Sequence, residues 1–372
     1  MGGARGRHEG APRARAPRNL SVNQGACYTE EVALCPPAFD RERRVWSLAT
    51  EMKRAVTTLK VLYWRGAARL QPEQTAHWRR LGQALHDAGD LRAASEVLYL
   101  ATQLDPACAE CHFALGTTMS ALGRLENSRV AFARANRLDP GNAETSFALG
   151  NVYFECGDID LALRAYRGAI QLRPDYARAH FNLGHAFKEK GLLQAAAAAF
   201  RRALAAEPRF YKARFMLAYV YALMDLNEEA VEQYRRTIHQ SPTYVKAYYN
   251  LGNCYLKSGR IELALDAYQT ILDFDPRHAR AHFAIGQAMA RSGRLEEALV
   301  AFQEALGLRT VFPECHLAFA RALETVGRVR EALHHYRAYV NDPSAVEQRA
   351  EVTAHIAELS RLALGSDTGT GH

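Results

Sequence analysis

The residues whose types and spacing could do chemistry are Cys108, Cys111 and His112. Read alone, Cys-Ala-Glu-Cys-His is the C-x-x-C-H motif that attaches haem in c-type cytochromes. The same place in sister segments holds Trp78 and His180, so packing explains the histidine without haem. No second C-x-x-C follows that could complete a zinc site. We therefore expect no cofactor and no metal, and the odd, dispersed set of seven cysteines predicts reduced thiols.

Other catalytic signatures are missing from the sequence. There is no phosphate-binding G-x-x-x-x-G-K-[ST], no G-x-G-x-x-G, no H-E-x-x-H and no G-x-S-x-G. Carboxylates such as Glu228, Glu229, Glu296 and Glu297 lie in pairs typical of a solvated helix face. We therefore predict that the chain is not an enzyme and has no small-molecule substrate.

The elements that would position any site follow a strict period of 34 residues. Seven prolines follow one another at a constant spacing of 34 residues. Glycines and alanines recur at fixed places between them. A period of this size indicates stacked supersecondary units, in which each unit contacts only its neighbours. The prolines are Pro72, Pro106, Pro140, Pro174, Pro208, Pro242 and Pro276.

Each unit is predicted to be a pair of helices. In the unit that begins at Ala177, His180, Leu183, Gly184 and Phe187 have the spacing of one helix face. Gly191 would end that helix, because glycine accepts the left-handed backbone of a helix C-cap. A second apolar stripe then runs as far as Pro208, which ends the second helix.

This pattern resembles the tetratricopeptide repeat, whose signature is W-x2-L-G-x2-Y…A-x3-F…P. The unit from Thr75 carries Trp78, Leu81, Gly82, Leu85, Ala94, Leu98 and Pro106 in that order. The resemblance implies an all-α, right-handed α-solenoid of about eight units over residues 75–343. The units would start near Thr75, Ala109, Ala143, Ala177, Tyr211, Val245, Ala279 and Pro313.

The ends of the chain differ from the repeats. Residues 40–74 are expected to form a capping helix or a degenerate repeat, with Val56, Leu59 and Tyr63 on its apolar stripe. Residues 344–364 read as a C-terminal capping helix that starts at a Ser344–Glu347 capping box. The Arg- and Pro-rich residues 1–39 are predicted to be disordered, and residues 365–372 to be a flexible tail.

The charge of the chain argues against a nucleic-acid partner. Residues 1–20 contain five arginines and one acidic residue, so this segment carries +4 of the formal net charge of +7. The remaining chain is only mildly basic. No apolar run indicates a secretory signal or a membrane span. We therefore expect a cytoplasmic protein, with a transit peptide at the arginine-rich start as the open alternative.

The candidate site lies on the first helix of each unit. In tetratricopeptide repeats the second, fifth, ninth, twelfth and thirteenth positions of that helix line a concave groove, so the resemblance implies a site for an extended peptide. Four consecutive units carry a cation at the second position, and aromatic and asparagine side chains accompany them. The predicted site is Arg178, Lys212, Lys246, Arg280, Asn151, Asn182, Asn250, Asn253, Phe181, Phe215 and Tyr249.

The sequence thus predicts a non-catalytic protein–protein interaction scaffold or adaptor. Its partners would be proteins that offer an extended, acidic segment, since lysine and arginine make charge-assisted bonds to carboxylates or phosphates. Two alternatives stay open. The run Ala-His-Phe-Asn-Leu-Gly at 179–184 is similar to the repeats of O-GlcNAc transferases, which implies an accessory subunit of an enzyme such as a glycosyltransferase. The other is an RNA-binding solenoid, with aromatic side chains stacking on bases.

Overall fold

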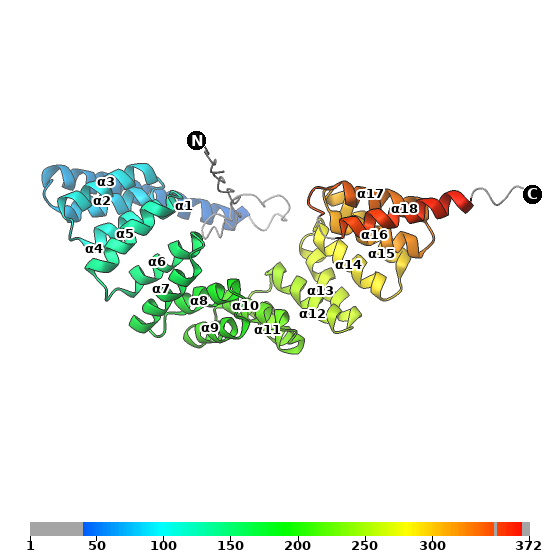
Figure 1. Cartoon of the computed structure of the whole chain (residues 1–372). Helices are drawn as coiled ribbons and strands as arrows, with labels where there is room; N and C mark the ends of the chain where they lie inside the picture. The colour runs from blue at the N-terminus through cyan, green and yellow to red at the C-terminus, as the bar shows by residue number, and fades with distance from the viewer. Residues whose placement is uncertain (1–39, 346–347, 367–372) are drawn as a thin grey trace, which may run out of the picture. The chain divides into compact units, whose positions relative to one another are not determined.

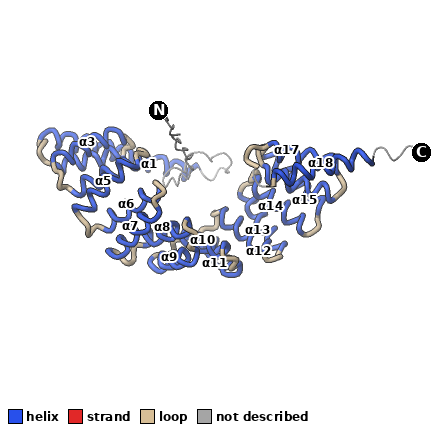
Figure 2. The backbone as a smooth tube through the Cα atoms, in the orientation of Figure 1, coloured by secondary structure: helices blue, strands red, loops and turns tan. Residues whose placement is uncertain are grey.

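The computed structural model describes residues 40–345 and 348–366, which form 18 α-helices and no strand (Figures 1 and 2). The chain divides into two compact units, residues 1–59 and 60–372, and only the second contains repeats. The helices are α1 (Asp40–Leu70), α2 (Thr75–Asp87), α3 (Leu91–Leu104), α4 (Ala109–Ala121), α5 (Leu125–Leu138), α6 (Ala143–Glu155), α7 (Ile159–Leu172), α8 (Ala177–Glu189), α9 (Leu193–Ala206), α10 (Tyr211–Leu223), α11 (Asn227–Gln240), α12 (Val245–Lys257), α13 (Ile261–Phe274), α14 (Ala279–Arg291), α15 (Leu295–Leu308), α16 (Pro313–Thr325), α17 (Val329–Asn341) and α18 (Arg349–Ser366).

Helices α2–α17 form eight antiparallel pairs that follow one another in chain order. All eight predicted unit starts are confirmed, since α2, α4, α6, α8, α10, α12, α14 and α16 begin at the residues that the period marked. Each pair packs on the next, so the array is an all-α repeat solenoid with a core that continues from unit to unit. The hand of its superhelix stays a prediction.

The turn inside each pair depends on a left-handed backbone residue. Gly191, after α8, has φ of +72°, and glycines after six other first helices also have positive φ. In the fifth unit the residue is Asp225, with φ of +57°. Aspartate is one of the few other residues that visits this region, because its short polar side chain can bond locally. The departure at Asp225 therefore leaves the turn geometry unchanged.

The contact between the two helices of a pair is close because one partner lacks a side chain. A Cβ atom on Gly184 of α8 would lie 2.7 Å from the ring of Phe200 on α9, and Gly150 stands in the same relation to Tyr166. These rings are almost completely buried. The glycine thus makes room for the aromatic side chain that fills each pair.

Both flanking helices differ from the expectation in detail. In α1, Val56, Leu59 and Tyr63 of the predicted stripe are exposed, while Trp64 and Ala68 pack against α2 instead. Helix α18 begins at Arg349, and the Ser344 hydroxyl bonds to Asp342, so no helix starts at Ser344. The other half of the proposed capping box, Glu347, lies outside the described residues, as do residues 1–39 and 367–372.

The apolar side of α18 packs on the last repeat. Val352 and Leu359 are buried in one cluster with Tyr336 and Tyr339 of α17. Across the described part of the chain, no helix combines the length and the apolar character needed to cross a membrane.

Candidate functional site

The four predicted cations lie at equivalent places in consecutive repeats. Arg178, Lys212, Lys246 and Arg280 are the second residues of α8, α10, α12 and α14, and all four are exposed. We call these four residues the basic row. Lys212, Lys246 and Arg280 form no ion pair or side-chain hydrogen bond with any described residue. Arg178 contacts two neutral rings, at 5.6 Å from the centroid of Phe147 and 5.8 Å from that of Tyr176.

The first helices of neighbouring repeats share one face of the array. Contacts join α2 to α4, α4 to α6, α6 to α8, α10 to α12 and α14 to α16, whereas no comparable contact joins successive second helices in the described residues. We call the surface of these first helices the first-helix face. At ordinary helix-packing distances of about 10 Å, the basic row would extend over roughly 30 Å.

The placement of the basic row opposes the helix dipole. The N-terminal end of a helix carries partial positive charge, so a cation in the first turn destabilises the helix by roughly 0.3–1 kcal/mol. The first turns of α8, α10, α12 and α14 contain no acidic residue, whereas those of α4, α6 and α16 contain Glu110, Glu144 and Glu314. Helix stability therefore does not explain the four cations.

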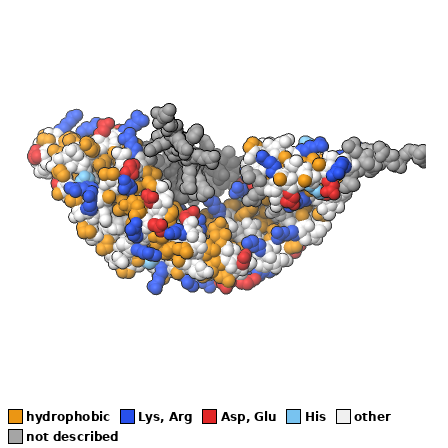
Figure 3. Space-filling view, in the orientation of Figure 1, with side chains coloured by type: hydrophobic (Ala, Val, Ile, Leu, Met, Phe, Trp, Pro, Cys, Tyr) orange, Lys and Arg blue, Asp and Glu red, His pale blue; other side chains and the backbone are white. Residues whose placement is uncertain are grey.

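The charge of the first-helix face changes towards the N-terminal repeats. A shallow depression of about 270 Å³ there is lined by Arg79, Glu110, Asp139 and Glu144, and Arg79 pairs with Glu110 at 3.0 Å. Next to Arg178 lies another depression, of about 380 Å³, lined by Arg173, Tyr176 and Glu207 among others. On the side of the molecule seen in Figure 3, charged and apolar side chains are interspersed.

The three predicted groove aromatics belong mainly to the core. Phe181, Phe215 and Tyr249 are half-buried, and each ring contacts the buried ring of its own second helix at centroid distances of 5.6–5.9 Å. Phe181 also packs on Phe210, at 4.9 Å, where the next repeat begins. Their contacts within the array therefore leave each side chain only partly available to a ligand.

The predicted asparagines have internal partners that sequence reasoning missed. The Asn151 Oδ1 accepts hydrogen bonds from the Tyr166 hydroxyl, at 3.0 Å, and from the Asn182 Nδ2, at 2.7 Å. The Asn253 Oδ1 accepts one from the Tyr268 hydroxyl at 2.7 Å, and the Asn250 Nδ2 donates to the Lys246 carbonyl. A signal was present, because each of these tyrosines follows its asparagine by 15 residues.

The fifth repeat lacks this bond. Tyr219 stands where Asn151 and Asn253 stand in their repeats, and the buried Tyr234 hydroxyl has no hydrogen-bond partner in the described part of the chain. A buried polar group without a partner costs about 1–3 kcal/mol, whereas a satisfied one contributes about 1 kcal/mol.

The tyrosine hydroxyls should therefore respond differently to removal. We expect Tyr268→Phe to lower the free energy of unfolding by about 1 kcal/mol, and Tyr234→Phe to leave it unchanged or raise it by up to about 1 kcal/mol. Urea denaturation followed by circular dichroism measures both. Equal losses in the two variants would show that the Asn253 bond contributes nothing.

In four of the first helices the side chain at the fourth position makes a hydrogen bond that fastens the preceding loop. The Trp78 Nε1 donates to the Pro72 carbonyl at 2.8 Å, and the Nε2 atoms of His112, His180 and His282 bond to the carbonyls of Pro106, Pro174 and Pro276 at 2.9–3.2 Å. His112 thus has the structural role that the sequence comparison with its sister repeats predicted. The described residues contain no group of three potential metal ligands.

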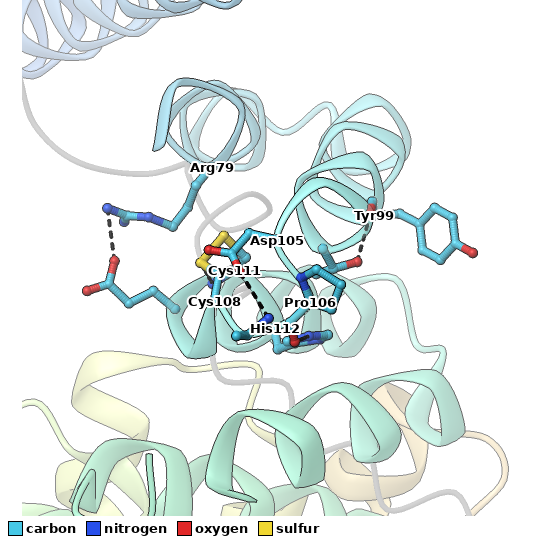
Figure 4. The surroundings of a disulfide bond; sticks show 10 residues. Arg79, Tyr99, Asp105, Pro106, Cys108, Cys111 and His112 are labelled. Atoms are coloured by element: carbon cyan, nitrogen blue, oxygen red, sulfur yellow. Dashed lines mark hydrogen bonds and ion pairs between the residues drawn. A yellow bond between two sulfur atoms is a disulfide. The ribbon is translucent and has the colours of Figure 1, made fainter. Parts of the chain in front are cut away.

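The prediction of reduced thiols is wrong for one pair of cysteines. Cys108 and Cys111 form a disulfide between the loop after Pro106 and the first turn of α4 (Figure 4). Sequence separation alone could not settle this, because a C-x-x-C pair can hold metal, haem or a disulfide. Cys156, Cys254 and Cys315 are free, and burial raises the pKa of the Cys254 thiol to about 11.

Two histidines stay neutral and add nothing to the charge of the array. Burial lowers the pKa of His185 to about 4, where its ring packs against Phe181 and Phe200. Burial, with His316 and His334 nearby, lowers the pKa of His335 to about 4 as well. At neutral pH His185 therefore adds no charge beside Phe181.

The fold and the repeated contacts define a class of helical repeat protein, and sequence comparison identifies it. Models of the tetratricopeptide repeat match residues 150–191 and 227–259, residues 249–310, and residues 78–108 and 177–210. The chain contains tetratricopeptide repeats. A search of curated protein sequences finds no match.

Solved structures with similar folds are also tetratricopeptide-repeat proteins. The Cut9–Hcn1 hetero-tetramer of the APC/C matches at 17% identity with a TM-score of 0.50, covering 73% of this chain and 54% of that one. MamA matches at 26% identity and a TM-score of 0.42, over 44% of this chain and 95% of its own. YrrB, described as a TPR protein with an unusual peptide-binding site, matches at 22% identity and a TM-score of 0.46. The match covers 53% of this chain and 98% of YrrB.

Proposed function

We propose that this chain is a protein-interaction scaffold that binds an extended, acidic peptide segment along its first-helix face. The observation that carries the proposal is the basic row, whose cations are exposed, lack an anionic partner among the described residues and oppose the dipoles of their own helices. An acidic ligand would supply the missing negative charge through charge-assisted bonds. The asparagines would assist through those amide atoms that the tyrosines do not use.

The length of the row sets the size of the ligand. About 30 Å corresponds to roughly nine or ten residues of an extended chain, at about 3.3 Å per residue. The ligand would run across α8, α10, α12 and α14, with its carboxylates near the four helix N-termini. Such a complex weakens as salt is added, because the charges are at the surface.

The test compares wild type with a variant in which Arg178, Lys212, Lys246 and Arg280 are all changed to Glu. We expect the variant to bind a fluorescent ten-residue Glu-rich peptide about tenfold more weakly, or worse, in fluorescence anisotropy. Glutamate in a first turn favours the helix, so the variant should fold at least as well. Circular dichroism checks this.

A matched control keeps the same change in net charge but moves it away from the row. Arg164, Arg201, Arg202 and Arg337 are exposed on second helices, and their change to Glu should leave peptide binding nearly intact. Equal losses in both variants would mean that only net charge matters, which contradicts the proposal. Binding of single-stranded RNA in place of the peptide, lost with the row, would favour the RNA-binding alternative.

Affinity purification with mass spectrometry of the same three proteins then identifies partners. Proteins that disappear with the row variant and remain with the control variant are the candidates for the natural ligand. An enzyme among them would support the accessory-subunit alternative, which activity assays of that complex with and without the chain would test. An unchanged set of partners would place their binding away from the basic row.

A further inference from the structure

The disulfide between Cys108 and Cys111 lies at the N-terminal end of α4 (Figure 4). Cys108 is the N-cap residue and is half-buried, whereas Cys111, one turn into the helix, has no exposed surface. Cys108 is therefore the more accessible of the two cysteines to an external thiol.

This disulfide does little to hold the fold together. It closes a loop with only two residues between the cysteines, and a loop this short restricts the unfolded chain much less than a long one does. The same turn is already closed by a backbone hydrogen bond from the Cys111 N–H to the Cys108 carbonyl, at 3.2 Å. Sister repeats make the turn without sulfur, with Asn142 as the N-cap residue of α6.

The position of Cys108 favours the reactive form of a thiol. The Cys111 N–H points at the Cys108 sulfur, with a distance of 3.1 Å between nitrogen and sulfur. The thiolate is the nucleophile in thiol–disulfide exchange, and a helix N-terminus stabilises it through its N–H groups and dipole. Two acids lie near the turn: Glu110 pairs with Arg79, and Asp105 of the preceding loop lies beside the disulfide (Figure 4).

We propose that Cys108 and Cys111 form a thiol–disulfide exchange site for low-molecular-weight thiols of the glutathione class. Cys108 is the reacting sulfur and Cys111 the resolving one. In reduction, an external thiolate attacks the Cys108 sulfur, the bond between the two cysteines breaks, and the Cys111 thiolate leaves and takes a proton. A second external thiol attacks the mixed disulfide, which releases Cys108 as a thiol and the external pair as a disulfide. Oxidation by glutathione disulfide runs the same steps backwards.

The first experiment uses the wild-type chain. The protein is equilibrated in buffers that range from fully reduced to fully oxidised glutathione. The samples are then quenched in acid, alkylated and digested. Mass spectrometry measures the mass of the peptide that contains residues 108–111. We expect two alkyl groups in reduced buffer and none in oxidised buffer. Cys156 is exposed and has no partner sulfur among the described cysteines, so it reports external oxidation in the same sample. A pair that stays as two thiols in buffer that modifies Cys156, or stays bonded in reduced glutathione, would overturn the proposal.

Two variants then separate the roles of the sulfurs. Cys111→Ala places the residue that Ala179 and Ala213 already provide at this buried position, and Cys108→Asn copies the N-cap of α6. With glutathione disulfide, Cys111→Ala should accumulate one glutathione on Cys108. In Cys108→Asn, Cys111 should react at least about tenfold more slowly. Equal reaction rates for Cys108 and Cys111 in the two variants would contradict the proposal that the external reagent reacts at Cys108.

Discussion

Replacing Tyr268 by alanine is expected to lower the free energy of unfolding of the repeat array by about 4 kcal/mol. The side chain is fully buried between α12 and α13, its ring contacts Tyr249, and its hydroxyl donates to Asn253. Truncation removes this burial and leaves a cavity, which for aromatic residues costs roughly 3–5 kcal/mol. The loss should be the largest of any single change considered for this chain.

The measurement is urea denaturation, with hydrogen exchange to locate the loss. Because each repeat contacts only its neighbours, we expect α12, α13 and α14 to lose protection before distant repeats do. Tyr99→Ala is the control, since that side chain is 57% exposed and its truncation should cost under about 0.5 kcal/mol. Similar losses in the two variants would disprove the assignment of Tyr268 to the core.

Replacing Gly184 by valine is expected to cost about 3 kcal/mol, although valine is the better helix former. The added Cβ would lie 2.7–2.9 Å from three ring atoms of Phe200, which is itself fully buried. Forcing extra groups into a packed contact costs roughly 1–3 kcal/mol, and the branched side chain puts the cost at the upper end. Differential scanning calorimetry should show a lowered melting temperature.

A glycine in the same array provides a control of opposite sign. Gly168 in α7 has open space where its Cβ would be, so Gly168→Ala should stabilise the chain by about 0.5–1 kcal/mol through helix propensity alone. A loss of stability at Gly168 as well would mean that close packing is not the reason for the glycine at 184. The fifth repeat, with Ala218 beside the buried Tyr234, indicates that one methyl group can be accommodated when the whole pair is spaced for it.

The fold could be predicted from the sequence because the same helix and turn signals occur in every repeat. The eight helix starts, from Thr75 to Pro313, depend on local turn and capping signals that recur every 34 residues. The flanking helices lack this redundancy. Tyr63 lay on the predicted apolar stripe of α1, but Tyr63 is exposed and the helix packs on α2 through Trp64.

The candidate site was predictable in its charges and not in its hydrogen bonds. The second position of a repeat helix is exposed by geometry, so Lys212 and Lys246 could be placed from their spacing. From the sequence, Asn151 and Asn253 were expected to be as available to a ligand as these lysines. Their oxygens instead accept hydrogen bonds from Tyr166 and Tyr268 on the second helices. Such bonds form only when the distance between the two helices is right to within a few tenths of an ångström.

By itself the sequence determined the class of fold, the boundaries of the eight repeats and the line of cations on consecutive first helices, because these follow from period and helix geometry. Only the tertiary structure decided which polar groups have partners within the array, and that Cys108 and Cys111 are joined, with Cys108 the more accessible of the two. The physical reason is that hydrogen bonds, burial and sulfur–sulfur bonding depend on distances between packed elements, whereas spacing along the chain determines only which face a residue occupies.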